Sequence, residues 1–117
     1  MLQMRTVVGL LDCEVACGQE ALETPVGACF AADLMSDVLA FSSSDALLIT
    51  GLTSVQSVHT AHVADCVGIL FVSGKHPSPE ALQLARDVSI PLLTTTHSMF
   101  EACGILSRNG LVGSARS

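Results

Sequence analysis

Three short polar clusters in this chain carry side chains that can do chemistry, and each follows an apolar run. Thr50-Gly51 ends the first run, Ser73-Gly74-Lys75 ends the second, and Thr95 with His97 follows the third. Hydroxyl, ammonium and imidazole groups can bind anions or transfer protons. The clusters therefore predict a ligand site, provided that the fold brings the ends of the three runs together.

The apolar runs before these clusters predict such a fold. Residues 46–49, 67–72 and 90–93 have the length of strands and contain no charged residue, as expected of strands that are buried on both faces. Helix-like stretches separate them, which predicts parallel pairing through crossover helices. We expect a single small α/β domain with a mostly parallel sheet, built from consecutive βα units with helices packed on the sheet. Ligands of such sheets bind outside the carboxyl ends of the strands.

Local signals mark the remaining elements. A short helix is predicted over 2–11, and strands over 13–17 and 26–32. Ser78-Pro79-Glu80 has the cap, proline and acid of a helix start, Ser98 and Glu101 fit a capping box, and Asn109-Gly110 fits a helix end. Thr53 or Ser54 is the expected N-cap of the helix that runs to Ala64. The domain is predicted to span 1–117, with a core over 12–111 and a frayed tail over 112–117.

The candidate ligand site lies at the predicted carboxyl ends of the strands, where backbone amides at the helix starts would supply further donors to an anion. Its residues are Thr50, Gly51, Thr53, Ser73, Gly74, Lys75, Thr95 and His97.

The segment from Gly68 to His76 is not a nucleotide-hydrolysing phosphate loop. Five residues separate Gly68 from Gly74 where the loop has four, and His76 rather than a hydroxyl residue follows Lys75. His59 and His62 share a helix face but no ligand spacing is completed, so we expect no metal and no cofactor. An enzyme that uses His97 or Lys75 is a less favoured alternative, because no partner carboxylate can be identified and no complete catalytic motif is present.

Composition restricts the partners of this chain. Its 117 residues are 50% hydrophobic and 14% charged with a net charge of −6, so it lacks the basic surface that a nucleic acid requires. No apolar stretch reaches the roughly 20 residues needed to span a membrane, and no signal peptide is evident, so we expect a cytoplasmic protein. The five scattered cysteines are expected to be free, buried thiols.

The stretch 33–41 is an expected interface. Asp33 or Ser36 could cap its helix, and the high apolar fraction of the chain predicts a homodimer or a protein partner at this helix. The expected interface residues are Leu34, Met35, Val38, Leu39 and Phe41.

Several pieces of the chain together resemble the DRTGG domain, a regulatory module of some phosphate acetyltransferases and CBS-domain inorganic pyrophosphatases. The chain is similar also to the non-catalytic N-terminal domain of HPr kinase/phosphorylase. Small stand-alone versions of the domain have about this length. The matching pieces are residues 33–38, 48–50, 68–74 with Pro77, and 90–94 with Ser98 and Phe100.

The resemblance implies an α/β fold, self-association and a regulatory or scaffolding role without catalysis. The name-giving residues differ: Leu52-Thr53 stands where the Asp-Arg pair would fall, and Ser73-Gly74-Lys75 replaces Thr-Gly-Gly. From the strand-end hydroxyls, the apolar composition and the resemblance together, we expect a ligand-sensing regulatory module that self-associates and binds a small anionic metabolite or nucleotide. A pure protein interaction domain is the alternative.

Overall fold

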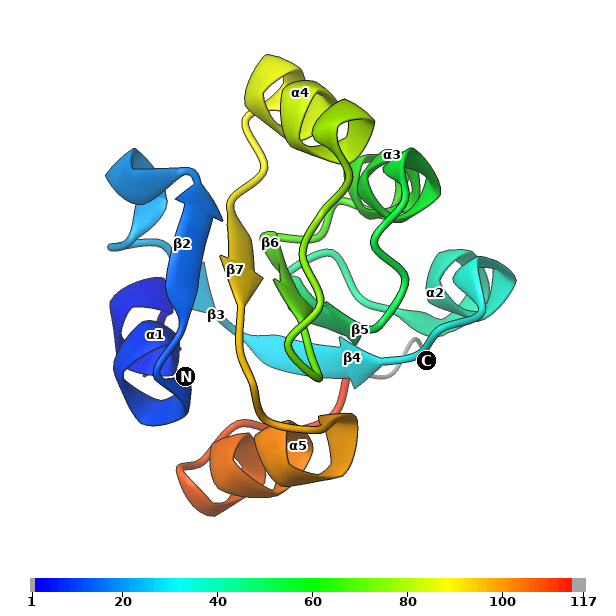
Figure 1. The fold of residues 1–117 in the computed structure, drawn as a ribbon. Helices are drawn as coiled ribbons and strands as arrows, with labels where there is room; N and C mark the ends of the chain where they lie inside the picture. The colour runs from blue at the N-terminus through cyan, green and yellow to red at the C-terminus, as the bar shows by residue number, and fades with distance from the viewer. Residues whose placement is uncertain (1, 115–117) are drawn as a thin grey trace.

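A five-stranded sheet of order β2-β7-β6-β5-β4 lies at the centre of the structure, a computed structural model that describes residues 2–114 (Figure 1). Strands β4 to β7 run parallel, whereas β2 pairs antiparallel with β7 at one edge. The expected α/β fold with a mostly parallel sheet is confirmed. The strands are β2 (Glu14–Cys17), β4 (Ala28–Ala31), β5 (Ala46–Thr50), β6 (Gly68–Phe71) and β7 (Leu92–Thr94).

Helices cover both faces of this sheet (Figure 1). One face carries α2 (Met35–Phe41), α3 (Val55–Val63) and α4 (Pro79–Val88), and the other carries α1 (Met4–Leu11) and α5 (Met99–Arg108). The two faces form two separate hydrophobic clusters. In the described part of the chain, no helix is long and apolar enough to cross a bilayer.

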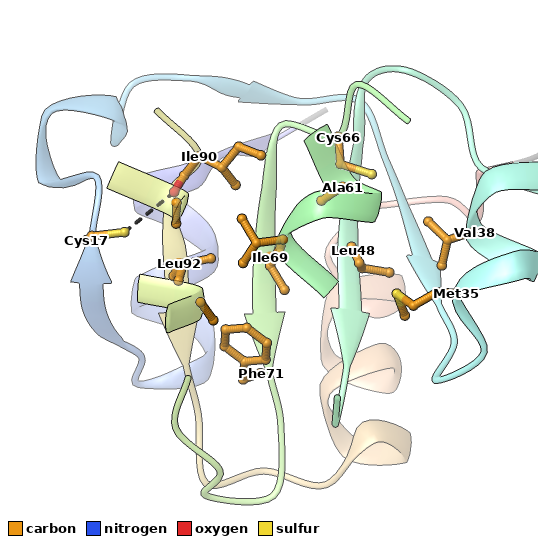
Figure 2. Packing of buried hydrophobic residues seen from close by; sticks show 13 residues of the cluster. Cys17, Met35, Val38, Leu48, Ala61, Cys66, Ile69, Phe71, Ile90 and Leu92 are labelled. Carbon is orange, nitrogen blue, oxygen red and sulfur yellow. Dashed lines mark hydrogen bonds between the residues drawn. The ribbon is translucent and has the colours of Figure 1, made fainter. Parts of the chain in front are cut away.

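The central strands supply side chains to both clusters in alternation. Leu48 of β5 packs toward α2 and α3, as Figure 2 shows, whereas Leu47 and Ile49 pack toward α1 and α5. All residues of β5, β6 and β7 are buried. This is why these segments read as continuous apolar runs rather than as alternating ones.

The helix ends follow the sequence signals in most cases. Ser78 Oγ accepts a hydrogen bond of 3.1 Å from the Ala81 amide at the start of α4. Ser98 and Glu101 form the predicted capping box of α5, and the predicted pair Asn109-Gly110 directly follows the last residue of this helix. Ser54 is the N-cap of α3, but its side chain makes no capping hydrogen bond.

The amino-terminal region differs in detail from the prediction. The expected helix begins at Met4, because Leu2–Gln3 forms a short strand, β1, that pairs antiparallel with β3 (Pro25–Val26). The expected strand over 26–32 is divided into β3 and β4. The turn between β2 and β3 contains a 3₁₀ helix, η1 (Gln19–Ala21).

Residues 112–114 of the expected frayed tail pair with the edge of the sheet. The Val112 carbonyl accepts a hydrogen bond of 2.9 Å from the Cys29 amide, and the Ser114 amide donates one of 2.7 Å to the Cys29 carbonyl. A parallel bridge thus joins Gly113 to the outer edge of β4. Backbone pairing with an edge strand carries no side-chain signal, so the sequence did not reveal it. Residues 115–117 of the expected tail lie outside the described residues.

Candidate functional site

The candidate site lies at the carboxyl edge of the sheet. Because β4 to β7 are parallel, the loops that follow them meet at this edge. All eight residues of the predicted ligand set belong to these strand ends and loops: Thr50, Gly51, Thr53, Ser73, Gly74, Lys75, Thr95 and His97. The structure thus brings the predicted residues to one edge, although their environments differ.

Backbone hydrogen bonds fix the loop that carries Lys75. The Ser73 amide donates to the His97 carbonyl at 2.7 Å, and the Gly74 amide donates to the Thr95 carbonyl at 2.9 Å. On the other side, the Ser78 amide donates to the Thr53 carbonyl at 3.0 Å. The loop after β6 is therefore held by the loops after β7 and β5. The Ser73 and Gly74 amides are engaged in these bonds and do not face a ligand as donors.

The same loop contains an unusual backbone turn. Ser73 and Gly74 are consecutive left-handed residues, with φ values of 62° and 71°. For a residue with a Cβ atom this conformation costs roughly 1–2 kcal/mol. Asp12, Asp65 and Ser89, the other non-glycine residues with positive φ among residues 2–114, each lie just beyond the end of a helix. Ser73 instead turns the chain sharply out of β6, and such strain is typical of functional loops.

Asp33 joins the ends of β4 and β5. Its Oδ1 atom accepts hydrogen bonds from Thr50 Oγ1 at 3.0 Å and from the Gly51 amide at 2.8 Å. Thr50 Oγ1 also accepts from the Leu52 amide at 3.1 Å. The buried Thr50 hydroxyl is thus committed to the fold rather than to a ligand.

The predicted capping roles of Asp33 and Ser36 are therefore wrong. Leu34 is the N-cap of α2 and makes no side-chain cap, because the Asp33 carboxyl group turns toward Thr50 instead. Ser36 lies within the helix. The signal that could have placed Asp33 at the site is its position directly after a strand of the parallel sheet.

Lys75 and Asp33 flank Gly51 with opposite charges. A Cβ atom placed on Gly51 would lie 3.2 Å from Lys75 Nζ and 3.6 Å from Asp33 Oδ1. Within residues 2–114, Arg5 pairs with Glu23 and the His97 imidazole lies near Glu101, whereas Lys75 and Asp33 are close to the same point without pairing. The absence of a side chain at Gly51 leaves room for both groups.

Thr95 and His97 lie in the loop that follows β7 at the same edge of the sheet. Thr95 is buried, and its Oγ1 donates to the Leu11 carbonyl at 2.7 Å and accepts from the His97 amide at 3.3 Å. His97 Nδ1 lies 3.9 Å from Glu101 Oε1. Hydrogen bonds from the Ser98 backbone and side chain, and to a lesser degree the charge of His97, lower the pKa of Glu101. That carboxylate belongs to the capping box, so it is a helix-end group rather than a catalytic base.

All five cysteines are free, and their environments disfavour thiolate chemistry. Burial raises the pKa of each thiol, and for Cys13 and Cys29 it raises the pKa to about 12. Neutral thiols are poor nucleophiles and poor metal ligands. Cys17 and Cys66 are buried as expected, whereas Cys13, Cys29 and Cys103 are partly accessible.

Two hollows in the described surface lie away from this edge. One, of about 310 Å³, lies between β2 and the end of α4 and includes Gly18 and Arg86. The other, of about 560 Å³, lies between β4, α5 and residues 110–113 and includes Cys29 and Cys103. The predicted ligand set lines neither of these two hollows.

Of the five expected interface residues at α2, two are buried and three are exposed. Met35 and Val38 are buried in the core of this chain, because they face the sheet (Figure 2). They are therefore not available to a partner. Leu34, Leu39 and Phe41 are exposed by 61%, 43% and 56%.

Comparisons with known proteins identify a similar fold. No protein-family profile matches the sequence, and no curated protein sequence does so. The regulatory region of a Clostridium perfringens pyrophosphatase, which contains CBS and DRTGG domains and was crystallised with the activator diadenosine tetraphosphate, superposes with a TM-score of 0.73 at 19% identity. The match covers 89% of this chain and 45% of that one, so this chain spans less than half of the neighbour's length. At this identity the likeness shows a shared fold, one found in a DRTGG-containing regulatory region.

Proposed function

We propose that this chain is a non-catalytic regulatory module of the DRTGG type, which binds a small anionic metabolite or a nucleotide at the carboxyl edge of its sheet. The observation that carries this proposal is the position of Lys75 Nζ beside Gly51, on a loop that is fixed from both sides. A fixed loop backbone reduces the conformational freedom that would be lost when Lys75 binds an anion. Lys75 is also the only lysine in a chain of net charge −6.

The chemistry of the edge supports binding rather than catalysis. The hydroxyls of Thr50 and Thr95 are engaged in hydrogen bonds within the protein. The carboxylate near His97 is held by a helix cap. Catalysis would need a nucleophile or a proton-transfer pair that faces the same open position. The edge offers instead the ammonium group of Lys75 and the carboxylate of Asp33, both on exposed residues.

The pyrophosphatase region supports a nucleotide as the first ligand to test, because that structure contains diadenosine tetraphosphate as an activator. Thermal unfolding of this protein with ATP and with diadenosine tetraphosphate is the direct experiment. A ligand at about 100 times its dissociation constant adds about 2.7 kcal/mol to the free energy of unfolding. We expect stabilisation of the natural chain and its loss in Lys75→Met.

Arg86→Met is the matched control, because it removes one exposed positive charge from α4, away from the carboxyl edge. Stabilisation that persists in Lys75→Met, or that disappears equally in Arg86→Met, would contradict a site at Lys75. An absence of stabilisation by either nucleotide would contradict the nucleotide part of the proposal.

Self-association through α2 is a second proposal, favoured by the exposed side chains of Leu34, Leu39 and Phe41. Light scattering would measure the molar mass of the natural chain and of Phe41→Asp. We expect a homodimer that dissociates in this variant. Phe100→Asp is the control, because Phe100 is 87% exposed on α5, which covers the opposite face of the sheet. A monomeric natural chain would leave α2 as a surface for a different protein.

A further inference from the structure

The Asp33 carboxylate is a rigid acceptor at the candidate site. Its Oδ1 atom is held by two donors, Thr50 Oγ1 and the Gly51 amide. Among the described residues, its Oδ2 atom has no hydrogen-bond partner. A carboxylate that is fixed through one oxygen presents the other in a defined direction, and carboxylate oxygens accept hydrogen bonds from hydroxyl groups.

This carboxylate restricts which anions can bind beside Lys75. Lys75 Nζ and both Asp33 carboxylate oxygens would lie within 3.9 Å of a Cβ atom on Gly51. A bare anion drawn to the ammonium group would therefore meet a negative charge a few ångströms away, and like charges repel at such distances. A ligand that places hydroxyl donors next to its anionic group would satisfy both side chains.

We propose that the ligand is a ribonucleotide, with its phosphate groups at Lys75 and the vicinal hydroxyls of its ribose at Asp33. This inference rests on the proposed binding function and adds the chemical class of the ligand. Asp33 is then a specificity-determining residue, a role separate from the charge that Lys75 provides.

Calorimetric titration of the natural chain with ATP and with 2′,3′-dideoxy-ATP tests this assignment, in the presence of EDTA so that no divalent cation contributes. The two probes share the base and the phosphates and differ only in the ribose hydroxyls. A hydrogen bond to a charged group contributes enough free energy that we expect ATP to bind at least about tenfold more tightly. Inorganic phosphate is expected to bind far more weakly than either nucleotide.

Asp33→Asn and Asp37→Asn form the matched pair of variants. Asparagine at position 33 keeps an oxygen for the Thr50 and Gly51 donors but replaces the free acceptor with an amide donor. We expect the Asp33 variant to bind the two nucleotides equally. The Asp37 variant loses the same charge from the first turn of α2 and should keep the natural preference.

The outcomes separate the two proposals. Equal affinity of the natural chain for ATP and dideoxy-ATP, with both lost in Lys75→Met, would retain the binding site and overturn the ribose assignment. A natural preference that persists in Asp33→Asn would also overturn it. No binding of ATP at millimolar concentration would overturn the nucleotide site itself and the ribose assignment with it.

Discussion

The hydroxyl of Thr50 donates a hydrogen bond of 3.0 Å to Asp33 Oδ1 and joins the carboxyl ends of the neighbouring strands β5 and β4. The same hydroxyl oxygen accepts from the Leu52 amide and supports the loop that leaves β5. One buried side chain thus orients the carboxylate of the candidate site and shapes the loop beside Lys75. Thr50 therefore links the stability of the fold to the proposed ligand site.

Thr50→Val tests this coupling, because valine has nearly the same shape and lacks the hydroxyl. The variant would leave the Leu52 amide without its partner and Asp33 Oδ1 with a single donor. We expect a loss of about 1.5–3 kcal/mol in the free energy of unfolding, the range for a hydrogen bond to a charged group. Urea denaturation measures it. Thr96→Val, at an exposed position of the same edge, should change stability by less than about 0.5 kcal/mol.

The capping box of α5 predicts a pH dependence. Hydrogen bonds from Ser98 hold the pKa of Glu101 below its ordinary value, so the ionised carboxylate favours the folded state. This contribution is complete above the pKa of the unfolded chain and is lost as the pH falls through the lowered pKa of the folded chain. Glu101→Gln should be less stable than the natural chain at pH 7, and the difference should shrink in acid. Carboxyl chemical shifts followed by NMR would report the pKa, and an ordinary value would contradict the capping role.

The strands could be predicted because burial on both faces leaves a continuous apolar signal. The runs that contain Leu48, Leu70 and Leu93 are followed by polar residues, and parallel pairing places those residues at one edge. This part of the candidate site therefore follows from local sequence and one general rule of topology. The capping box at Ser98 is likewise local, since both partners lie within three residues.

The role of Asp33 could not be predicted in the same way. Its contacts with Thr50 and Gly51 depend on the register between β4 and β5, which brings together residues that are 17 and 18 positions apart. The antiparallel pairing of β2 and the bridge at Gly113 depend on long-range backbone contacts in the same way. Local sequence patterns carry no information about contacts between residues so far apart in the chain.

Gly18 and Gly9 predict opposite effects of the same substitution. Gly18 has a φ of 87°, and a Cβ atom there would lie 2.6 Å from the Pro91 Cα atom, which is backbone and cannot move aside. We expect Gly18→Ala to lower the free energy of unfolding by roughly 2–4 kcal/mol, from the strained conformation and the overlap together. In Gly9→Ala, the new methyl group meets nothing within 4 Å on helix α1. That variant should be more stable by about 1 kcal/mol. Thermal unfolding of both would show the contrast, and equal effects would contradict the packing of Gly18 on Pro91.

The turn at Ser73 predicts a stability gain from glycine. Its φ of 62° is costly for serine and is free of strain for glycine, so Ser73→Gly should raise the free energy of unfolding by up to about 1 kcal/mol. Ser54→Gly is the control, because Ser54 has a φ of −77° in extended backbone and glycine there should lower stability by a few tenths of a kcal/mol. Urea denaturation of both variants decides the point. A loss of stability in Ser73→Gly would mean that the serine side chain contributes more to the loop than its backbone conformation costs. The Lys75 loop would then owe its order to that side chain as well as to the amide bonds of Ser73 and Gly74.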